Sequence, residues 1–327
     1  MRLSILGAGS WGTALALVLA PRFESINLWV YERELAAKMR ETRENELFLP
    51  GFRLPDHLKF ETEIADALEG AEFVLGVMPS HHARRVYTAA RTALRPGISL
   101  VSATKGLENG TLLRMTQVIH EVTGLPVAAL SGPTFAREVA RGEPTALVVA
   151  SEDAALANRV QAAFSGPAFR LYTNDDPVGV ETGAALKNVI AIGAGICAGL
   201  GLGSNSLAAL ITRGLAEITR LAVSLGGKPL TLAGLAGLGD LVLTCTGELS
   251  RNRTVGMELA KGRRLDDIVG GMRMVAEGVQ TTYAAVDLAG KQGVEMPITA
   301  QMDAIFRHGK APREAIRDLM ERSLKGE

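Results

Sequence analysis

Cysteine and excess charge are both scarce in this chain. Only 2 Cys occur in 327 residues, Cys197 and Cys245, and they lack CxxC spacing, which excludes a disulfide framework and a cysteine-rich zinc site. The 35 Lys and Arg balance the 35 Asp and Glu, so the chain lacks the basic excess that phosphate-dominated binding to nucleic acid needs. We therefore predict a protein of a reducing compartment, taken to be the cytoplasm, with no nucleic-acid partner.

Long uninterrupted apolar runs are also missing. Residues 3–20 are mostly apolar and end in a faint resemblance to a signal-peptide cleavage site, but Gly7, Gly9 and Gly12 interrupt them. Residues 189–203 are apolar too, yet they are shorter than the roughly 20 residues that span a bilayer and are rich in Gly and Ala. We predict that this second stretch is a tightly packed helix and that no segment spans a membrane.

Sequence signatures of metal sites and of hydrolases are not found. His81 and His82 are adjacent, so on an extended chain their rings point in opposite directions, and no Asp, Glu or Cys cluster joins them in the sequence. Walker A, H-E-x-x-H and G-x-S-x-G patterns do not occur. We predict that the protein holds no metal.

What is present is the composition of a globular protein with two unlike halves. Hydrophobic residues make up 47% and charged residues 21%, and the length suits two domains of roughly 150 residues each. Short apolar runs alternate with helical patterns as far as Asp175-Asp176-Pro177, after which long Ala-, Leu- and Gly-rich helical patterns follow. We predict an α/β domain over residues 1–178, with a doubly wound parallel sheet, and an all-helical domain over residues 179–327.

The apolar runs of the first half predict the strands of this sheet. The candidate strands are Arg2 to Leu6, Ile26 to Tyr31, Phe73 to Val77, Ile98 to Ser102, Val127 to Leu130 and Ala146 to Ala150. Ligands of doubly wound sheets lie beyond the carboxyl ends of the strands. We therefore expect Gly7, Pro79-Ser80, Lys105-Gly106 and Ser131-Gly132-Pro133 to converge on one crevice.

The first of these strand ends carries a dinucleotide-binding pattern. Gly7-Ala8-Gly9-Ser10-Trp11-Gly12 follows the first strand and opens a helical pattern from Thr13 to Ala20. In this context Gly7 permits the tight turn, Gly9 lets a pyrophosphate approach the backbone, and Gly12 lets helix and strand pack closely. The pattern predicts a nucleotide site, with a purely structural glycine turn as the alternative.

Tyr31-Glu32-Arg33 ends the second strand, where such folds bind the adenosine ribose. An acidic side chain there accepts the ribose 2′-hydroxyl of NAD, whereas a cation neutralises the 2′-phosphate of NADP. Glu32 and Arg33 stand side by side, and the sequence does not decide which faces the ribose. The choice between NAD and NADP stays open, as does the alternative of a solvated charge pair.

Lys187 and Asp240 are polar residues in apolar, Gly-rich surroundings. Burial would depress the pKa of Lys187 and let it exchange a proton with a carbinol or carbonyl oxygen, although a lysine reaching out to solvent explains it equally simply. Asp240 could pair with Lys187, accept a substrate hydroxyl, or cap a helix at Leu241.

The segment Ser250-Arg251-Asn252-Arg253 precedes a helical run. Ser250 suits an N-cap, but arginines in a first helical turn oppose the helix dipole unless an anion docks there. The segment therefore predicts a phosphate site formed by amides, Arg251 and Asn252, with solvent-facing arginines as the alternative.

Seven blocks in this order resemble the bacterial form of the NAD(P)-dependent glycerol-3-phosphate dehydrogenase family over nearly the whole chain. The blocks are Gly7 to Ala14, Val77 to His81, Ala103 to Leu107, Ser131 to Ala136, Glu181 to Asn188, Gly237 to Leu241 and Ser250 to Asn252. The resemblance implies a Rossmann domain followed by a helical domain like that of 6-phosphogluconate dehydrogenase. It also implies reversible reduction of dihydroxyacetone phosphate to sn-glycerol 3-phosphate for phospholipid synthesis, by a homodimer that uses NAD or NADP.

The resemblance also assigns residues to roles. Lys187 and Asp240 correspond to the catalytic pair, with Lys187 as proton donor and acceptor. The substrate shell comprises Lys105, Gly132, Thr134, Lys187, Asp240, Ser250, Arg251 and Asn252. The cofactor contacts comprise Gly7, Gly9, Ser10, Trp11, Gly12, Tyr31, Lys105, Ala136, Arg251, Val275 and Glu277. Two departures stand out: Thr134 replaces a frequent Ser, and Tyr31 replaces a frequent Arg or His, so that a cation for the 2′-phosphate is missing there.

Two other readings share some of these features. A β-hydroxyacid dehydrogenase of the same two-domain type would carry the glycine pattern and the helical-domain lysine but would act on a carboxylate substrate. A non-catalytic NAD(P)-sensing module would bind the cofactor without transferring hydride, and the presence of Lys187, Asp240, Arg251 and Asn252 argues against it.

Overall fold

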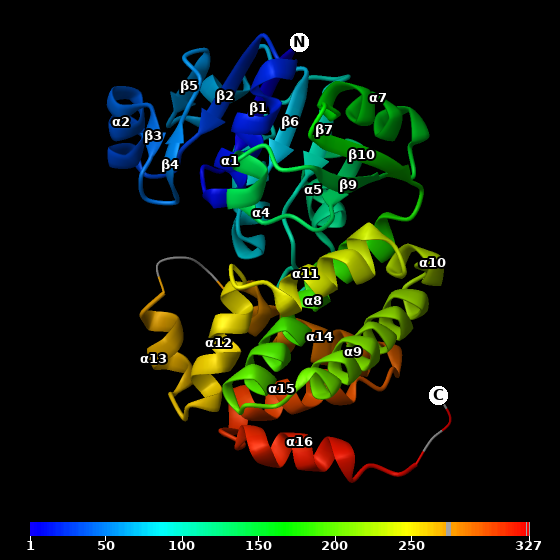
Figure 1. The fold of residues 1–327 in the computed structure, drawn as a ribbon. Helices are drawn as coiled ribbons and strands as arrows, with labels where there is room; N and C mark the ends of the chain where they lie inside the picture. The colour runs from blue at the N-terminus through cyan, green and yellow to red at the C-terminus, as the bar shows by residue number, and fades with distance from the viewer. Residues whose placement is uncertain (273–275, 325, 327) are drawn as a thin grey trace.

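The structure is a computed structural model that describes residues 1–272, 276–324 and 326, and it has two parts (Figure 1). The N-terminal part, blue to green in Figure 1, is a sheet covered by helices. The C-terminal part, green to red, consists of helices gathered around α8 (Pro177–Gly199). An α/β region followed by a helical region is the predicted order.

A twisted sheet forms the N-terminal part. In the described residues it has 8 strands in the order β10-β9-β8-β7-β6-β1-β2-β5, and β3 and β4 pair separately. The strands are β1 (Arg2–Leu6), β2 (Ser25–Trp29), β3 (Glu44–Asn45), β4 (Leu49–Arg53), β5 (Leu58–Glu61), β6 (Phe73–Gly76), β7 (Ser99–Ser102), β8 (Val127–Ser131), β9 (Thr145–Ala150) and β10 (Phe169–Asn174). Strand β1 pairs in parallel with β2 on one side and β6 on the other, so the sheet is doubly wound as predicted.

Strands β9 and β10 run against the direction of the other strands, whereas the sequence predicts a parallel sheet. All the predicted strands are present, with ends that differ by two residues at most. However, β9 runs antiparallel to β8, and β10 runs parallel to β9, so the sheet is mixed at this edge. Residues 132–144 hold only the short helix α6 (Ala136–Ala140), which packs against α1 (Ser10–Leu19) instead of crossing the sheet. Without a crossover helix, an antiparallel return is the accessible connection.

Strands β5 and β10 were not predicted, and their burial explains why. They are the two edges of the sheet, and along each of them buried and solvent-facing residues alternate at the start of the strand. Their sequences, LKFE and FRLYTN, therefore mix charged and apolar residues, whereas central strands buried on both faces form continuous apolar runs.

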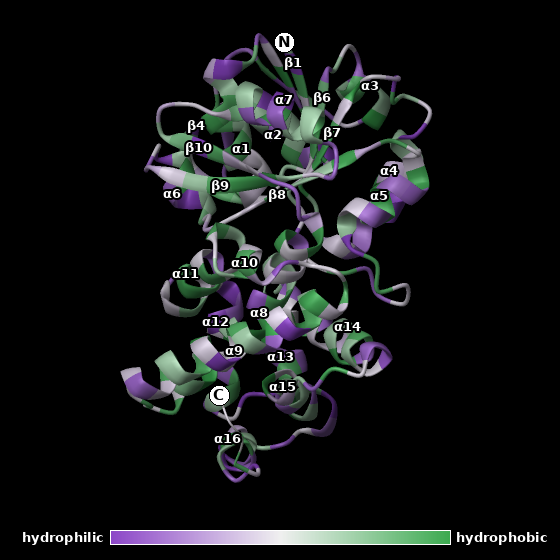
Figure 2. Cartoon of the chain, turned by 90° about the vertical axis from the view of Figure 1, so that its right-hand side faces the viewer, coloured by the Kyte–Doolittle hydropathy of each residue, from purple (hydrophilic) through white to green (hydrophobic). Residues whose placement is uncertain are grey.

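Helices cover both faces of the sheet, and the side chains of β1 show how. Leu3 and Ile5 point into a core shared with α1, α2 (Arg33–Thr42) and α7 (Ala154–Phe164). Leu6 points into a second core. The helices of that second core are α3 (Ile64–Leu68), α4 (Ala83–Ala90) and α5 (Met115–Thr123). Figure 2 agrees, because strands such as β9 are mostly green while outer helices such as α4 and α5 carry purple segments.

The helical part is organised around α8. The other helices are α9 (Ser204–Ser224), α10 (Pro229–Leu232), η3 (Leu235–Gly239), α11 (Asp240–Thr246), α12 (Arg251–Ala260), α13 (Leu265–Gly270), α14 (Glu277–Gln292), α15 (Pro297–His308) and α16 (Pro312–Met320). Helices α9, α11, α12 and α14 all pack on α8. A Cβ on Gly195 would lie 1.9 Å from the Arg253 carbonyl oxygen, and one on Gly256 would lie 1.9 Å from that of Ile192. Glycine therefore lets α8 and α12 touch backbone to backbone.

Within the residues that the structure describes, two stretches are long and apolar enough for a membrane span by length and composition, which is weak evidence by itself. One is α8, whose apolar window is 89% buried inside the protein, as the predicted packed helix would be. The other, Pro229–Thr246, is divided among α10, η3 and α11. Burial within the protein core accounts for the composition of α8.

Candidate functional site

The glycine-rich turn joins β1 to α1 in the way its spacing predicts. Gly7 has φ +122°, a backbone conformation that side chains disfavour, and a Cβ on Gly12 would lie 1.9 Å from the Gly7 carbonyl oxygen. Helix α1 begins at Ser10, three residues earlier than expected, so its N-terminal amides face the turn. A Cβ on Gly9 would meet nothing within 4 Å. The turn therefore has open space at the place where a pyrophosphate would approach the backbone.

A cavity of about 620 Å³ lies beside this turn and extends between the two parts of the protein. The cavity is lined by these residues of the expected site: Gly7, Gly9, Ser10, Trp11, Gly12, Tyr31, Lys105, Thr134, Ala136, Lys187, Ser250, Arg251, Asn252 and Glu277. Gly132 and Asp240 lie behind the lining and contact Lys105, while Val275 lies outside the described residues. The predicted convergence of the strand ends on one crevice is thus confirmed for Gly7, Pro79 and Lys105.

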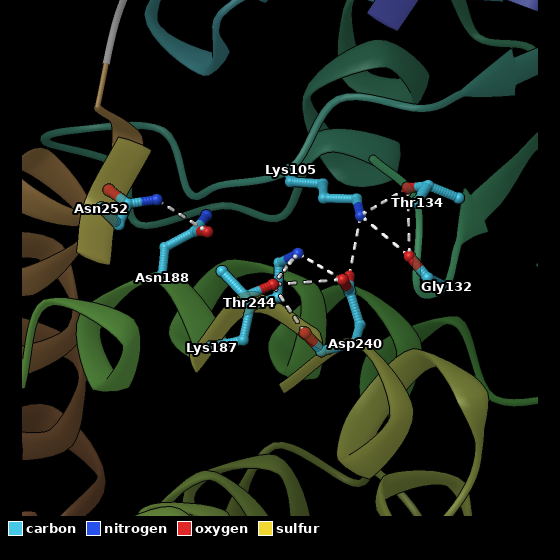
Figure 3. A network of polar contacts seen from close by, with 8 residues as sticks. All are labelled: Lys105, Gly132, Thr134, Lys187, Asn188, Asp240, Thr244 and Asn252. Carbon is cyan, nitrogen blue, oxygen red and sulfur yellow. Dashed lines mark hydrogen bonds and ion pairs between the residues drawn. The ribbon is translucent and has the colours of Figure 1, made fainter. Parts of the chain in front are cut away.

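Lys187 and Asp240 form a buried ion pair at the floor of the cavity (Figure 3). Lys187 lies on α8 and is 6% exposed, and Asp240 is the first residue of α11 and is fully buried. Lys187 donates a hydrogen bond to Asp240 Oδ1 and a second, of 2.9 Å, to Thr244 Oγ1. Lys187 therefore does not reach solvent, and Asp240 pairs with it rather than capping a helix.

A second lysine shares the same carboxylate. Lys105 follows β7, and its Nζ lies 2.7 Å from Asp240 Oδ2, 3.1 Å from the Gly132 carbonyl oxygen and 3.3 Å from Thr134 Oγ1. Figure 3 shows Lys105 approaching Asp240 from the sheet side and Lys187 approaching it from the helical side. One carboxylate thus connects the two parts of the protein through two cations.

Burial sets the protonation chemistry of Lys187. Removal from water lowers the pKa of Lys187, the negative charge of Asp240 opposes this change, and the positive charge of Lys105 adds to it, so that the pKa is about 7. A lysine with a pKa near neutrality can both give and take a proton under ordinary conditions. The arrangement can therefore act as a proton donor and acceptor for a group placed beside Lys187 in the cavity.

Thr244 belongs to this network and was not predicted. It lies four residues after Asp240 on α11. Its hydroxyl donates a 2.6 Å hydrogen bond to the Asp240 carbonyl oxygen and accepts the hydrogen bond from Lys187. Residues four apart on a helix lie on one face. That spacing is the signal in the sequence that could have identified Thr244.

The Ser250 segment also lines the cavity. Ser250 is the N-cap of α12, as predicted, and its hydroxyl accepts the backbone N–H of Arg253. Asn252 donates a 3.0 Å hydrogen bond to Asn188 Oδ1 and accepts one of 3.0 Å from the Gly278 backbone N–H. The Asn252 carboxamide is thus oriented by α8 and α14 together. Asn188, the neighbour of Lys187, also lines the cavity, and the sequence does not predict this.

Glu277 closes the cavity from the first turn of α14. Its carboxylate accepts hydrogen bonds from the Ser80 backbone N–H at 3.3 Å and the Ser80 hydroxyl at 2.9 Å. Burial raises the pKa of Glu277, and these two donors work against that rise. The contact links the loop after β6 to the helical part.

Glu32 and Arg33, which follow β2, have different surroundings. Glu32 is the N-cap residue of α2 and lines the cavity. Arg33 is the first residue of α2, and its guanidinium lies 2.7 Å from Glu63, with both side chains exposed outside the cavity lining. The acidic residue therefore lines the cavity, and the basic one does not.

No metal site is evident: within residues 1–272, 276–324 and 326, no group of three or more His, Cys, Asp or Glu side chains is arranged to hold an ion. His81 and His82 lie against each other with ring centroids 3.9 Å apart. His82 lines the cavity.

A doubly wound sheet with a glycine-rich first turn, joined to a helical part that supplies a buried lysine, defines a class: two-domain dehydrogenases that use a nicotinamide dinucleotide. Comparison with known proteins gives the family. Residues 2–157 match the model of the NAD-dependent glycerol-3-phosphate dehydrogenase N-terminus, and residues 176–317 match that of its C-terminus. The chain belongs to the NAD-dependent glycerol-3-phosphate dehydrogenase family, as the sequence blocks predicted, and it is an enzyme of that family.

Curated relatives and solved structures agree. A glycerol-3-phosphate dehydrogenase [NAD(P)+] of Koribacter versatilis is 60% identical over 98% of this chain and 97% of its own length. A glycerol-3-phosphate dehydrogenase [NAD(P)+] from Geobacter sulfurreducens is 54% identical over 100% of this chain and 98% of its own length. The crystal structure of the Coxiella burnetii glycerol-3-phosphate dehydrogenase superposes with a TM-score of 0.94 at 41% identity, covering 98% of this chain and 99% of that one. The cofactor is accordingly NAD or NADP.

Proposed function

We propose that this protein catalyses the reversible, NAD(P)H-dependent reduction of dihydroxyacetone phosphate to sn-glycerol 3-phosphate. The observation that carries the proposal is the burial of Lys187 against Asp240 in a cavity that the glycine-rich turn also lines. Relatives that share more than half of this sequence carry the name of that activity.

Lys187 is the proton carrier in this proposal. The bound nicotinamide cofactor supplies the hydride that the ketone carbon receives. Protonated Lys187 donates a hydrogen bond to the ketone oxygen, stabilises the negative charge that develops there, and passes its proton to that oxygen. The ketone thus gains one hydride and one proton, and neutral Lys187 takes up a new proton, which its pKa near 7 allows.

Asp240, Lys105 and Thr134 position this carrier and the substrate. Asp240 holds Lys187 in place and favours the protonated form of Lys187. Lys105 reaches the same carboxylate and the Thr134 hydroxyl from the sheet side, where it can also contact substrate and cofactor. The Gly132 carbonyl fixes the Lys105 ammonium at 3.1 Å.

The substrate phosphate binds at the start of α12 in this proposal. The helix N-terminus supplies amides and a positive dipole end, and Arg251 and Asn252 add a guanidinium and a carboxamide. Ser250 shapes the turn through its N-cap bond. Binding the phosphate away from the reacting carbon converts remote binding energy into positioning.

The cofactor site is proposed on the sheet side of the cavity. Its contacts are Gly7, Gly9, Ser10, Trp11, Gly12, Tyr31, Lys105, Ala136, Arg251 and Glu277, together with Val275 from the resemblance. The open space at Gly9 and the N-terminus of α1 support this placement. We place the division between domains at residue 178, one residue after α8 begins.

The cellular setting is part of the proposal. We infer a cytoplasmic homodimer whose product serves phospholipid synthesis. Exposed apolar side chains in the helical part support a partner surface there, with Leu230 on α10 at 83% exposure and Val242 on α11 at 40%. Light scattering after size-exclusion chromatography should give twice the chain mass, and a single chain mass at micromolar concentration would reject the dimer.

A spectrophotometric assay tests the reaction. We expect oxidation of NADH or NADPH with dihydroxyacetone phosphate, and a loss of at least about 100-fold in kcat for Lys187→Ala, because general acid groups contribute that much. Lys228→Ala is the matched control, because Lys228 is an exposed lysine that pairs with Asp175 outside the cavity lining. Turnover of a 3-hydroxyacid instead of the phosphate would point to a β-hydroxyacid dehydrogenase. Cofactor binding without hydride transfer would indicate a sensing module.

A further inference from the structure

The two charged residues that follow β2 do not explain how the site would bind the 2′-phosphate of NADP. Among the two charged residues after β2, Glu32 lines the cavity, whereas Arg33 is held at 2.7 Å by Glu63 outside it. A site with only Glu32 would accept a 2′-hydroxyl and repel a 2′-phosphate. The cation, if the site has one, must come from another element.

Arg85 reaches this end of the cavity from the other side of β1. It lies on α4, which follows β6, and β6 and β2 flank β1 in the sheet. Their carboxyl ends are therefore about two strand spacings apart, roughly 10 Å, a distance that a long side chain can cover. The guanidinium carbon of Arg85 lies 5.5 Å from the centre of the Tyr31 ring, and both residues line the cavity.

Among the described residues no carboxylate pairs with Arg85, in contrast to its neighbour Arg84. Arg84 forms two 2.8 Å hydrogen bonds with Glu108 and one of 3.0 Å with Glu121. In the part of the chain that the structure describes, Arg85 makes no ion pair. Arg85 is thus a cation at the rim of the cavity, stacked on an aromatic ring that fixes its direction.

Nearby positive charge also contributes to the lowered pKa of the neighbouring His82, after burial. His82 also lines the cavity, and its pKa is lowered first by burial and then by the nearby charges of His81 and Arg85. An anion bound between Arg85 and Tyr31 would relieve this accumulation of positive charge.

We propose that Arg85, stacked on Tyr31, is the residue that binds the 2′-phosphate of NADP(H), and that Glu32 binds the 2′-hydroxyl of NAD(H). The two residues approach the ribose from opposite sides of β1, so the site accepts both cofactors. The inference rests on the nucleotide site proposed above. It deepens that site by assigning cofactor choice to α4 instead of to Arg33.

Calorimetric titration of the whole protein with two cofactor fragments tests the inference. Adenosine 2′,5′-bisphosphate carries the 2′-phosphate, and 5′-AMP lacks it. We expect wild type to bind the bisphosphate more tightly than 5′-AMP. Arg85→Ala should weaken the bisphosphate at least about tenfold and leave 5′-AMP within about twofold, because a charge-assisted contact to phosphate is lost. Arg85→Lys should fall between the two.

Arg33→Ala is the matched control, since it removes an arginine of the same region that points away from the cavity. It should leave both affinities unchanged. The inference is overturned if Arg85→Ala weakens both fragments equally, which would mean stacking on the adenosine, or if Arg33→Ala rather than Arg85→Ala loses the bisphosphate. Failure of wild type to bind either fragment or NADH would instead reject the proposed nucleotide site itself.

Discussion

The two walls of the cavity hold their functional groups in opposite ways. On the sheet side, the backbone of the glycine-rich turn leaves open space at Gly9, and side chains such as Tyr31 and Arg85 are exposed. On the helical side, Lys187 and Asp240 are buried and bonded to each other. The sheet side therefore depends on the backbone geometry of its turn and on exposed side chains, and the ion pair of the helical side depends on buried partners.

The energetic reason lies in solvation. A buried charge is tolerated only while its partner is present, and removing one member of such a pair costs about 3–5 kcal/mol. The free energy of an exposed cation at the rim of the cavity changes little when its surroundings change. The comparison thus predicts which substitutions abolish the activity and which only tune it.

The largest effect should come from Gly12→Ala. The new Cβ would lie 1.9 Å from the Gly7 carbonyl oxygen, a backbone atom that cannot move aside, so the turn must distort. We expect NADH affinity to fall at least about 100-fold and the melting temperature to drop. Gly9→Ala meets nothing within 4 Å, so it should keep the melting temperature while weakening NADH. Normal NADH binding by both variants would remove the turn from the nucleotide site.

Asp240→Asn should follow, with a kcat lower by about 100-fold. The change keeps the shape of the side chain but removes the charge that Lys187 and Lys105 share. Because Asp240 raises the pKa of Lys187, its loss should also move the pH profile of reduction to lower pH. Steady-state kinetics across pH tests both statements, and an unshifted profile would contradict the role of Asp240.

The pH dependence of wild type should sharpen the same comparison. In the proposed mechanism reduction needs protonated Lys187, so the kcat of reduction should fall as pH rises through about 7, whereas the kcat of alcohol oxidation should fall as pH drops through that value. Lys105→Met removes a positive neighbour that lowers the pKa of Lys187, so the reduction profile should move to higher pH. Opposite shifts for Lys105→Met and Asp240→Asn form the test, and shifts of the same sign would refute it.

The smallest effect is expected for Glu277→Gln. Glutamine keeps an oxygen that can accept the Ser80 hydroxyl, so the contact between the two parts survives in weaker form. NADH affinity should change by about threefold or less, measured by fluorescence titration, and Ser80→Ala should not add to the effect. Additive losses would show that Glu277 and Ser80 act independently.

The sequence predicts the sheet side better than the helical side, for a physical reason. The glycine turn and the strands beside it follow from spacing within a short segment, so β1, Gly7 and Gly12 were identified directly. Strand β10 was missed because an edge strand mixes polar and apolar residues, and the antiparallel β9 was missed because strand direction is set by a connection, not by an apolar run.

The helical side depends on contacts between distant residues. Lys187 and Asp240 are 53 residues apart, and composition alone allowed Lys187 to face solvent. The residues alone allow a pair between Lys187 and Asp240 as one of three alternatives for Asp240, and the resemblance to a family assigns both residues to the catalytic pair. Nothing local marked Arg85 as a partner of Tyr31, because that contact depends on the order of β2, β1 and β6 in the sheet.

The backbone contact between α8 and α12 has a consequence for substrate choice. Lys187 lies on α8, and the phosphate-binding turn that we propose begins α12. The glycines at 195 and 256 let these two helices pack in direct backbone contact. In the proposed function, the distance between the proton carrier and the phosphate site is therefore set by the packing of α8 against α12. We therefore expect the enzyme to select substrates by the number of bonds between the ketone oxygen and the phosphate, so that a homologue one carbon longer can reach one of the two groups but not both.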